Sequence, residues 1–290
     1  MRRLHALTLL FLASAAAGPA FGQLVLPGAL PPSTPSSFGP ASGGNGSPAP
    51  GQAAPAPKPA IQKSPPEESV FGRSLSLNGA SGALTVEKTA AGAQIGHLVL
   101  PGFLLSRPAE ACRVEVAGGN ISLHPAVRHE GLVSYDVELE SCPFAIDILD
   151  SAALARGKVC DFTAADCRVD PAGVWGPAPS QLSPADDKNI EHMRSESETE
   201  ARALFRALLE ANKQNRSRIK ELARDQAGFS SARAEICRDF AGEDKHGFCA
   251  SRITQARAVA LSTQLHGPSA EGGLLSQRRS ARPNRVLRPG

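Results

Sequence analysis

Apolar and polar residues alternate along the middle of the chain. The clearest run is VSYDVELE, residues 133–140, in which four apolar side chains alternate with four polar ones. The runs SLSL, RVEV and ISL repeat the pattern from Ser74, Arg113 and Ile121. A period of two places one face of a strand in a core and the other in water. Because the turn-forming stretches NGASG and AGGN separate such runs, we expect an antiparallel β-sandwich or small barrel over residues 70–180.

The spacing of the apolar residues changes to three and four after Asp186. One stripe, with two polar interruptions, runs through Leu204, Leu208, Ala211, Asn215, Ile219, Leu222 and Gln226. This spacing predicts one long amphipathic helix, and the sequence SPADD at 183–187 supplies its start signals. A second helix is expected over residues 248–265. The fold class is therefore predicted to be α+β, with an α-hairpin over residues 186–265 after the β-region.

The N-terminus has the features of a secretory signal peptide. Arg2 and Arg3 precede the apolar run LTLLFLASAAA, and the small residues of AFG follow at 20–22. The apolar run is shorter than the roughly 20 residues that a membrane-spanning helix needs. We therefore expect residues 1–22 to be a cleaved signal peptide; the alternative is an uncleaved anchor.

The two flanks of the folded regions have compositions typical of unfolded chain. Residues 27–69 consist mainly of Pro, Gly, Ser and Ala, so residues 23–69 are expected to form a disordered, partly polyproline II spacer. Residues 266–290 carry five arginines among Gly, Ser and Pro. We expect a disordered basic tail there, either simply solvated or in contact with an anionic envelope surface. The net charge of +3 is too small to indicate nucleic-acid binding.

The six cysteines all lie beyond the predicted signal peptide. Export to an oxidising compartment and an even count predict disulfides, with no free thiol. The short spacing between Cys160 and Cys167 predicts a disulfide that closes a loop between them. Cys112 is then expected to pair with Cys142.

The remaining pair, Cys237 and Cys249, is separated by eleven residues that include His246. A zinc site needs about four ligands, and only these three lie close in sequence. A catalytic redox pair usually has two intervening residues rather than eleven. A structural disulfide between the ends of two helices fits the spacing and the compartment, and in the chain-entropy model it would stabilise the fold by about 3 kcal/mol.

The two helices that flank this pair carry a distinctive set of residues. The first has Gln226, Phe229, Arg233 and Cys237, and the second has Cys249, Thr254, Arg257 and Leu261. In these residues the region 203–265 resembles the LprI-like lysozyme-inhibitor family of exported bacterial proteins. Phe229 stands where that family usually has Trp, and the family's earlier cysteine-bearing helix has no counterpart here. The N-terminal β-region resembles no known family.

The resemblance implies that the helical region binds a lysozyme-type glycosidase or another envelope protein. The natural contact would be the loop of residues 238–248, where Arg238, Lys245 and His246 could pair with the two carboxylates of a muramidase cleft. The alternative is that the shared residues only hold the helices together.

In that structural alternative, Phe229 and Leu261 pack between the helices. Arg233 and Arg257 then bond to loop carbonyls or to a neighbouring acid.

The sequence contains no motif of a known catalytic site. It lacks the nucleophile elbow, the zinc-protease helix, the P-loop and the dinucleotide-binding turn, so we expect no enzyme activity, no cofactor and no metal. His97, His124 and His129 are expected to be surface residues rather than a metal site. Trp175 is expected to cap the β-core; alternatively it stacks on a carbohydrate.

We therefore expect an exported, non-catalytic binding protein of the periplasm or cell envelope, with inhibition of a cell-wall glycosidase as the sharpest hypothesis. One alternative is a structural or scaffolding periplasmic protein. The other is a carbohydrate-binding β-domain, which would need Trp175 exposed in a groove.

Overall fold

The computed structural model describes residues 59–116 and 121–267. The predicted signal peptide, most of the predicted spacer, the AGGN turn and nearly all of the basic tail lie outside the described residues. In the part of the chain that is described, no helix combines the length and the apolar character needed to cross a bilayer.

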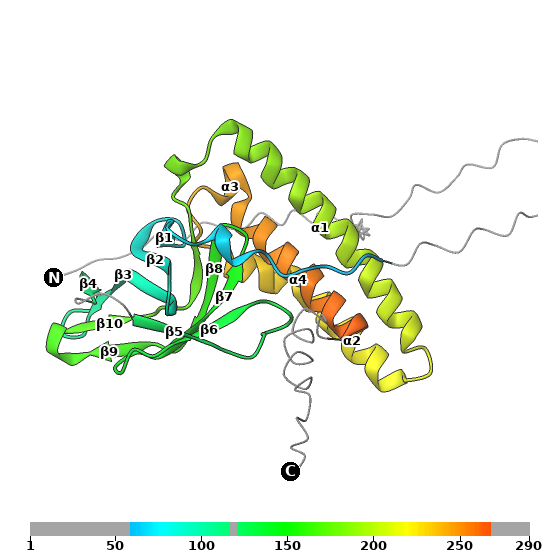
Figure 1. Cartoon of the computed structure of the whole chain (residues 1–290), viewed down its shortest axis with the longest axis horizontal. Helices are drawn as coiled ribbons and strands as arrows, with labels where there is room; N and C mark the ends of the chain where they lie inside the picture. The colour runs from blue at the N-terminus through cyan, green and yellow to red at the C-terminus, as the bar shows by residue number, and fades with distance from the viewer. Residues whose placement is uncertain (1–58, 117–120, 268–290) are drawn as a thin grey trace, which may run out of the picture. The chain divides into compact units, whose positions relative to one another are not determined.

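The described residues contain eleven strands in one antiparallel sheet. Eight of them close into a barrel in the order β2–β1–β11–β8–β7–β6–β5–β3, because β3 also pairs with β2 (Figure 1). The other three, β4, β10 and β9, extend from the second half of β3. The strands are β1 (Ser74–Leu77), β2 (Ser81–Thr89), β3 (Gly92–Leu104), β4 (Ala111–Glu115), β5 (Ile121–Pro125), β6 (Ser134–Val137), β7 (Phe144–Leu149), β8 (Ala152–Gly157), β9 (Cys160–Phe162), β10 (Cys167–Val169) and β11 (Gly173–Gly176). Of the two predicted architectures, the small barrel is confirmed.

Apolar side chains fill the inside of the barrel. The period-two pattern explains this, because alternate residues such as Leu84 and Val86 of β2 or Ile146 and Ile148 of β7 point into one cluster. Trp175 lies in the same cluster, fully buried, and its indole N–H donates to the carbonyl of Pro171 at 3.0 Å. The ring thus belongs to the core and cannot stack on a sugar, as the carbohydrate-binding alternative required.

Four α-helices follow the barrel in sequence: α1 (Pro184–Ala211), α2 (Arg216–Ile236), α3 (Glu243–His246) and α4 (Phe248–His266). Three 3₁₀ helices add single turns: η1 (Glu67–Ser69), η2 (Thr163–Ala165) and η3 (Pro179–Gln181). Helix α1 begins at the predicted place, where Ser183 and Asp186 cap each other's backbone N–H groups.

The single long helix predicted from the stripe at 204–226 is wrong. The chain turns over residues 212–215, and the stripe is divided between α1 and α2. The polar interruptions are the cause: the Asn212 side chain donates to the carbonyl of Leu208, and the Asn215 side chain accepts from the N–H of Arg218 and caps α2. The two halves of the stripe still meet, because Leu208 and Leu222 share one cluster.

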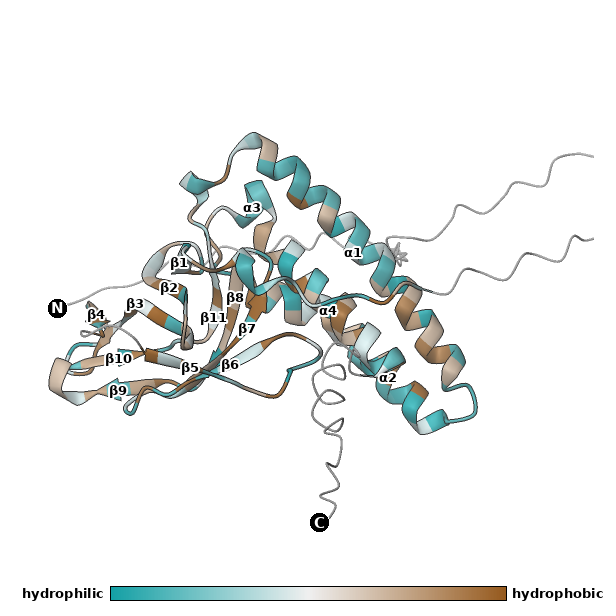
Figure 2. Ribbon diagram, in the orientation of Figure 1, coloured by the Kyte–Doolittle hydropathy of each residue, from teal (hydrophilic) through white to brown (hydrophobic). Residues whose placement is uncertain are grey.

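Helices α1 and α4 pack along each other and run in the same direction. Near their starts, Ser251 of α4 donates to the carbonyl of Ile190 of α1 at 3.1 Å, and near their ends Leu208 and Leu261 share a cluster. Figure 2 shows apolar residues concentrated in the second half of α1. The barrel faces this layer with Leu149, Ala152 and Val174, which pack against Ile190, Phe248, Ile253 and Val259.

Helix α2 runs back antiparallel to α4 and is mostly exposed. Arg233 of α2 reaches Thr254, and Arg218 reaches Gln264, whereas Leu222 is the fully buried side chain of α2. The helical region is therefore a three-helix layer in which α1 supplies the main contact of α4, not the expected pair of helices alone.

The predicted disorder of residues 23–69 is wrong for its last part. Residues 59–69 lie against the folded region: the N–H of Gln62 donates to Ser262 of α4, and Ser64 accepts from the N–H of Val133. Pro65 is buried, and Glu67 in η1 accepts a hydrogen bond from Tyr135. Amino-acid composition does not reveal individual polar contacts of this kind. The order of residues 59–69 could therefore not be predicted from composition alone.

Two of the three disulfides differ from the prediction. The structure pairs Cys112 with Cys167 and Cys142 with Cys160, whereas we expected Cys160–Cys167 and Cys112–Cys142. The strand pairing explains the difference, because β3 brings β4 and β10 together although they are far apart in sequence. The described chain has no free cysteine.

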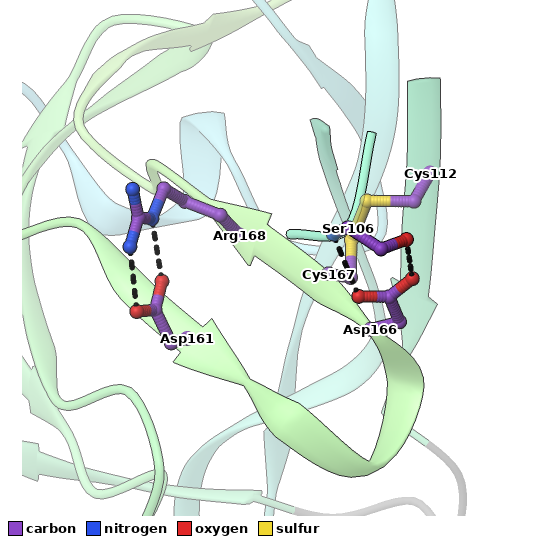
Figure 3. Close-up of a disulfide and its surroundings, with 6 residues drawn as sticks. All are labelled: Ser106, Cys112, Asp161, Asp166, Cys167 and Arg168. Atoms are coloured by element: carbon purple, nitrogen blue, oxygen red, sulfur yellow. Dashed lines mark hydrogen bonds and ion pairs between the residues drawn. A yellow bond between two sulfur atoms is a disulfide. The ribbon is translucent and has the colours of Figure 1, made fainter. Parts of the chain in front are cut away.

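The β9–β10 hairpin that carries Cys160 and Cys167 is also held by polar contacts (Figure 3). Arg168 donates from Nε and Nη2 to both carboxylate oxygens of Asp161, at 2.6 and 2.8 Å. At the tip, the backbone N–H of Ser106 donates to Asp166 at 3.0 Å. These contacts and the Cys112–Cys167 bridge fix the hairpin against the rest of the sheet.

Candidate partner-binding loop

The loop of residues 238–248, which we call the stapled loop, joins α2 to α4 across a disulfide. Cys237 ends α2 and Cys249 lies in the first turn of α4, and the structure bonds them as the sequence predicted, with 5.6 Å between their Cα atoms. The single turn of α3 lies inside the loop. Gly242 and Gly247 flank that turn with φ of 70° and 61°, a left-handed conformation that glycine adopts without strain.

Glu243 ties the stapled loop to the start of α4. Its two carboxylate oxygens accept from the N–H groups of Cys249 and Ala250, both at 2.8 Å. These N–H groups lack partners inside the helix, and a carboxylate at a helix N-terminus is favoured by the helix dipole. Burial nevertheless raises the pKa of Glu243 above its usual value, although the two backbone hydrogen bonds act in the opposite direction.

Aromatic and backbone contacts dock the other side of the stapled loop on the barrel. Phe240 stacks on Phe248 with 5.6 Å between ring centroids, and both rings belong to the cluster between barrel and helices. The N–H of Ala241 donates to the carbonyl of Asn78, in the turn after β1, at 2.8 Å. The loop is therefore fixed at its ends, along its inner side and by its own helical turn.

His246 is not placed to contact a partner, contrary to the prediction from the sequence. Its side chain is only 3% exposed, and its Nδ1 pairs with the carboxylate of Asp187 in α1. The expectation that it contacts a partner is wrong, because the ring points into the protein to meet an acid 59 residues earlier in the chain.

The other two predicted contact residues lie on the surface. Arg238 and Lys245 are both exposed, and Arg238 forms an ion pair with Glu235 of α2. Asp239 and Asp244 are exposed beside them, so the outer side of the loop presents charges of both signs. Such a surface can form ion pairs and hydrogen bonds with a polar partner.

The residues behind the family resemblance meet between α2 and α4. Phe229 lies between two guanidinium groups, 5.6 Å from Arg233 and 5.5 Å from Arg257, an arrangement that favours cation–π attraction. Arg233 donates to Thr254 at 2.7 Å and to Glu198 of α1 at 3.3 Å, as expected of a structural residue that finds a neighbouring acid.

Arg257 departs from what was expected of it, whereas Leu261 packs between the helices as predicted. Within the described residues, the buried Nε and Nη2 of Arg257 have no hydrogen-bond partner, and burial lowers the pKa of this guanidinium. Leu261 packs with Leu204 and Leu222 rather than with Phe229. The aromatic and the leucine therefore belong to two separate contacts of α4.

A buried carboxylate on the helix-facing side of the barrel was not predicted from the sequence. Asp147 of β7 is fully buried and accepts from Ser134 at 2.8 Å and from Arg156 at 2.7 and 2.9 Å. His129 lies 2.9 Å away through Nδ1. The signal in the sequence was a lone acid inside the apolar run FAIDIL.

The three histidines of the β-region are spread over separate contacts. His97 and His124 lie 3.7 and 3.6 Å from Glu115 and Glu138, while His129 is at Asp147. Over residues 59–116 and 121–267, no three His, Cys, Asp or Glu side chains are grouped so as to hold a metal ion.

No protein-family model, no curated protein and no solved structure matches the chain.

Proposed function

We propose that this protein is an exported, non-catalytic binding protein of the periplasm or cell envelope, and that it binds its partner through the stapled loop. The observation that carries the proposal is the fixation of this loop. The Cys237–Cys249 disulfide, the Glu243 cap, the His246–Asp187 pair and the Phe240–Phe248 stack all hold it in one conformation.

Fixation of this kind favours binding for a thermodynamic reason. Ordering a flexible loop on association costs about 0.5–1.5 kcal/mol for each long side chain immobilised, and a loop already ordered avoids part of that cost. Pre-organisation of an exposed loop is more than the fold itself requires, since the barrel has its own core and two disulfides of its own.

The sharpest version of the proposal is inhibition of a lysozyme-type glycosidase. The cleft of such an enzyme carries two carboxylates. Lys245 and Arg238 are the exposed cations of the stapled loop, and either could pair with these acids. Export fits the three disulfides, which persist in oxidising compartments.

A lysis assay tests this version directly. Purified protein in molar excess should slow the clearing of a cell-wall suspension by a muramidase, and Lys245→Glu or Arg238→Glu should weaken the effect by about tenfold or more. Lys220→Glu and Arg224→Glu, which change exposed cations of α2, serve as matched controls and should leave inhibition intact. Unchanged muramidase turnover at high molar excess of the protein would contradict the inhibitor proposal.

Binding to a different envelope partner has its own test. The protein would be used as bait in an envelope extract, with the Lys245→Glu variant run in parallel. A partner that is retained by the parent and lost with the variant would support the loop as the binding surface. Recovery of equal amounts with both proteins would favour the scaffolding alternative, in which another surface makes the contact.

A further inference from the structure

A second candidate site lies away from the outer side of the stapled loop, in a cavity of about 260 Å³. The cavity opens between the barrel and the first turns of α1 and α4. Its apolar walls include Leu75 of β1, Ile190 of α1 and Phe248 of α4. Its polar walls include Arg73, just before β1, and Arg252 of α4. Ligand sites typically combine such apolar walls with a few placed polar groups.

Arg252 is buried in the wall of this cavity, and its Nη1 has only weak hydrogen-bond partners. The residue is 5% exposed, and its guanidinium lies 4.6 Å from the centroid of the Phe248 ring. Its Nε donates to the carbonyl of Asp150 at 2.6 Å, and its Nη2 lies 3.4 Å from the Asp150 carboxylate. Among the described residues, its Nη1 has two partners, the thioether sulfur of Met193 at 3.7 Å and the hydroxyl of Ser251 at 3.4 Å.

These contacts leave the guanidinium incompletely satisfied. A guanidinium has five N–H donors in a planar fork that matches a carboxylate, and sulfur is a weak acceptor. A carboxylate placed in the cavity would supply a stronger acceptor than the thioether and the hydroxyl that Nη1 of Arg252 contacts. Buried polar groups are rarely left with such weak partners unless something else completes them.

Two arginines and one aspartate line the cavity. Asp150 compensates Arg252, whereas no described residue forms an ion pair with the exposed Arg73 at the rim. The acid in the lining, Asp186, keeps its negative charge, and its Oδ2 accepts from the N–H of Ser183 at 2.8 Å and from the Ser183 hydroxyl at 2.6 Å. Arg73 therefore has no ion-pair partner among the described residues and is able to pair with an anion.

We propose that this cavity binds a small organic carboxylate with an apolar body. The carboxylate pairs with Arg73 and with the weakly partnered Nη groups of Arg252, and the apolar body lies against Leu75, Ile190 and Phe248. The volume suits a molecule of about ten to fifteen non-hydrogen atoms, below the roughly 300 Å³ of the smallest drug-sized pockets. The proposal does not depend on the function proposed for the stapled loop.

The test compares an acid with its neutral amide. Phenylacetate and phenylacetamide, titrated into the purified protein and followed by two-dimensional amide NMR, have nearly the same shape but differ in charge. Phenylacetate should bind saturably below about 20 mM, and the amide should bind about tenfold more weakly or worse. The shifted amides should include those of Ser74, Ile190 and Arg252, which surround the cavity.

Two surface variants identify the site. Arg73→Gln removes the rim charge and should weaken phenylacetate binding about fivefold or more, whereas Arg224→Gln, an exposed arginine of α2, should not. Asn189→Trp, at an exposed position of α1 in the cavity lining, should block entry without disturbing the core. Absence of saturable binding, equal binding of acid and amide, or full binding by both Arg73→Gln and Asn189→Trp would each overturn the proposal. The shifts in the unsubstituted protein keep it testable if a variant fails to fold.

Discussion

Arg252 and Asp150 join the helices to the barrel across 102 residues of sequence. The Nε of Arg252 in α4 donates to the backbone carbonyl of Asp150, in the turn between β7 and β8, at 2.6 Å. The same guanidinium lies against Phe248 and inside the apolar contact between the two parts of the fold. One side chain therefore serves as a polar link in a mainly apolar interface.

Replacing this arginine should destabilise the protein strongly. Arg252→Met keeps most of the side-chain volume but leaves Asp150 without its partner, so the free energy of unfolding should fall by about 3 kcal/mol. Urea unfolding followed by circular dichroism measures the change. The exposed Arg224→Met should stay within about 0.5 kcal/mol of the parent. An Arg252→Met protein as stable as the control would show that the link contributes little.

Two aspartate–arginine pairs of similar geometry should differ in how much they stabilise the folded protein. Asp147 is fully buried against Arg156, while Asp161 pairs with Arg168 on the exposed β9–β10 hairpin (Figure 3). Asp147→Ala should lower the free energy of unfolding by about 3 kcal/mol, since it leaves three buried or half-buried donors unpaired. Asp161→Ala should leave the unfolding midpoint nearly unchanged because solvent screens an exposed pair. Similar losses in the two variants would contradict the role given to burial.

The disulfides can be mapped and removed. Mass spectrometry of unreduced peptides should find Cys112–Cys167, Cys142–Cys160 and Cys237–Cys249, with no free thiol among these six residues. The double variant Cys237→Ala, Cys249→Ala should lose about 3 kcal/mol of stability through the greater freedom of its unfolded chain. A peptide linking Cys160 to Cys167 would show that the strand pairing described here is not the one in solution.

Glu243 should make the stability of the folded protein depend on pH. Burial raises its pKa in the folded protein above the unfolded value of 4.5, so between these two values the folded state binds more protons. Stability conferred by this residue is therefore greatest below pH 4.5 and falls as the pH rises through the folded pKa. Glu243→Gln cannot ionise, so the stability of the parent relative to this variant should fall as the pH rises above 4.5.

Unfolding titrations at several pH values would measure this difference. The exposed neighbour Asp244, changed to Asn, serves as the control. A parent-minus-variant difference for Glu243→Gln that stays level or grows with pH would contradict the assignment.

Local patterns in the sequence predicted the parts of the fold that depend on residues close together in the chain. The alternation at 133–140 marked β6, and the spacing between Cys237 and Cys249 marked the disulfide across the stapled loop. The acid and serine of SPADD predicted the start of α1, because a helix cap needs only residues within one turn. Asn215 also carried a capping signal, but the apolar stripe on either side of it concealed the break.

Contacts between distant segments could not be predicted from the sequence. The Cys112–Cys167 bridge depends on which strands β3 brings together, and the burial of His246 depends on Asp187, which lies on another helix. The cavity is built from four such segments, and none of its arginines belongs to a recognisable motif. Long-range pairing of this kind follows from the topology, which a single sequence leaves open.

The closure of the barrel by β2 and β3 also limits how the molecule can self-associate. Exposed strand edges are templates for unwanted pairing with other chains. In the described part of the sheet, the strands left with one unpaired side beyond the closed ring are β4 and β9, of five and three residues. Each carries a cysteine that is bonded by a disulfide to another strand or turn. Neither strand can therefore easily detach from the sheet and pair with a second copy of the protein. The topology of the sheet and its two disulfides therefore protect the protein against edge-to-edge aggregation.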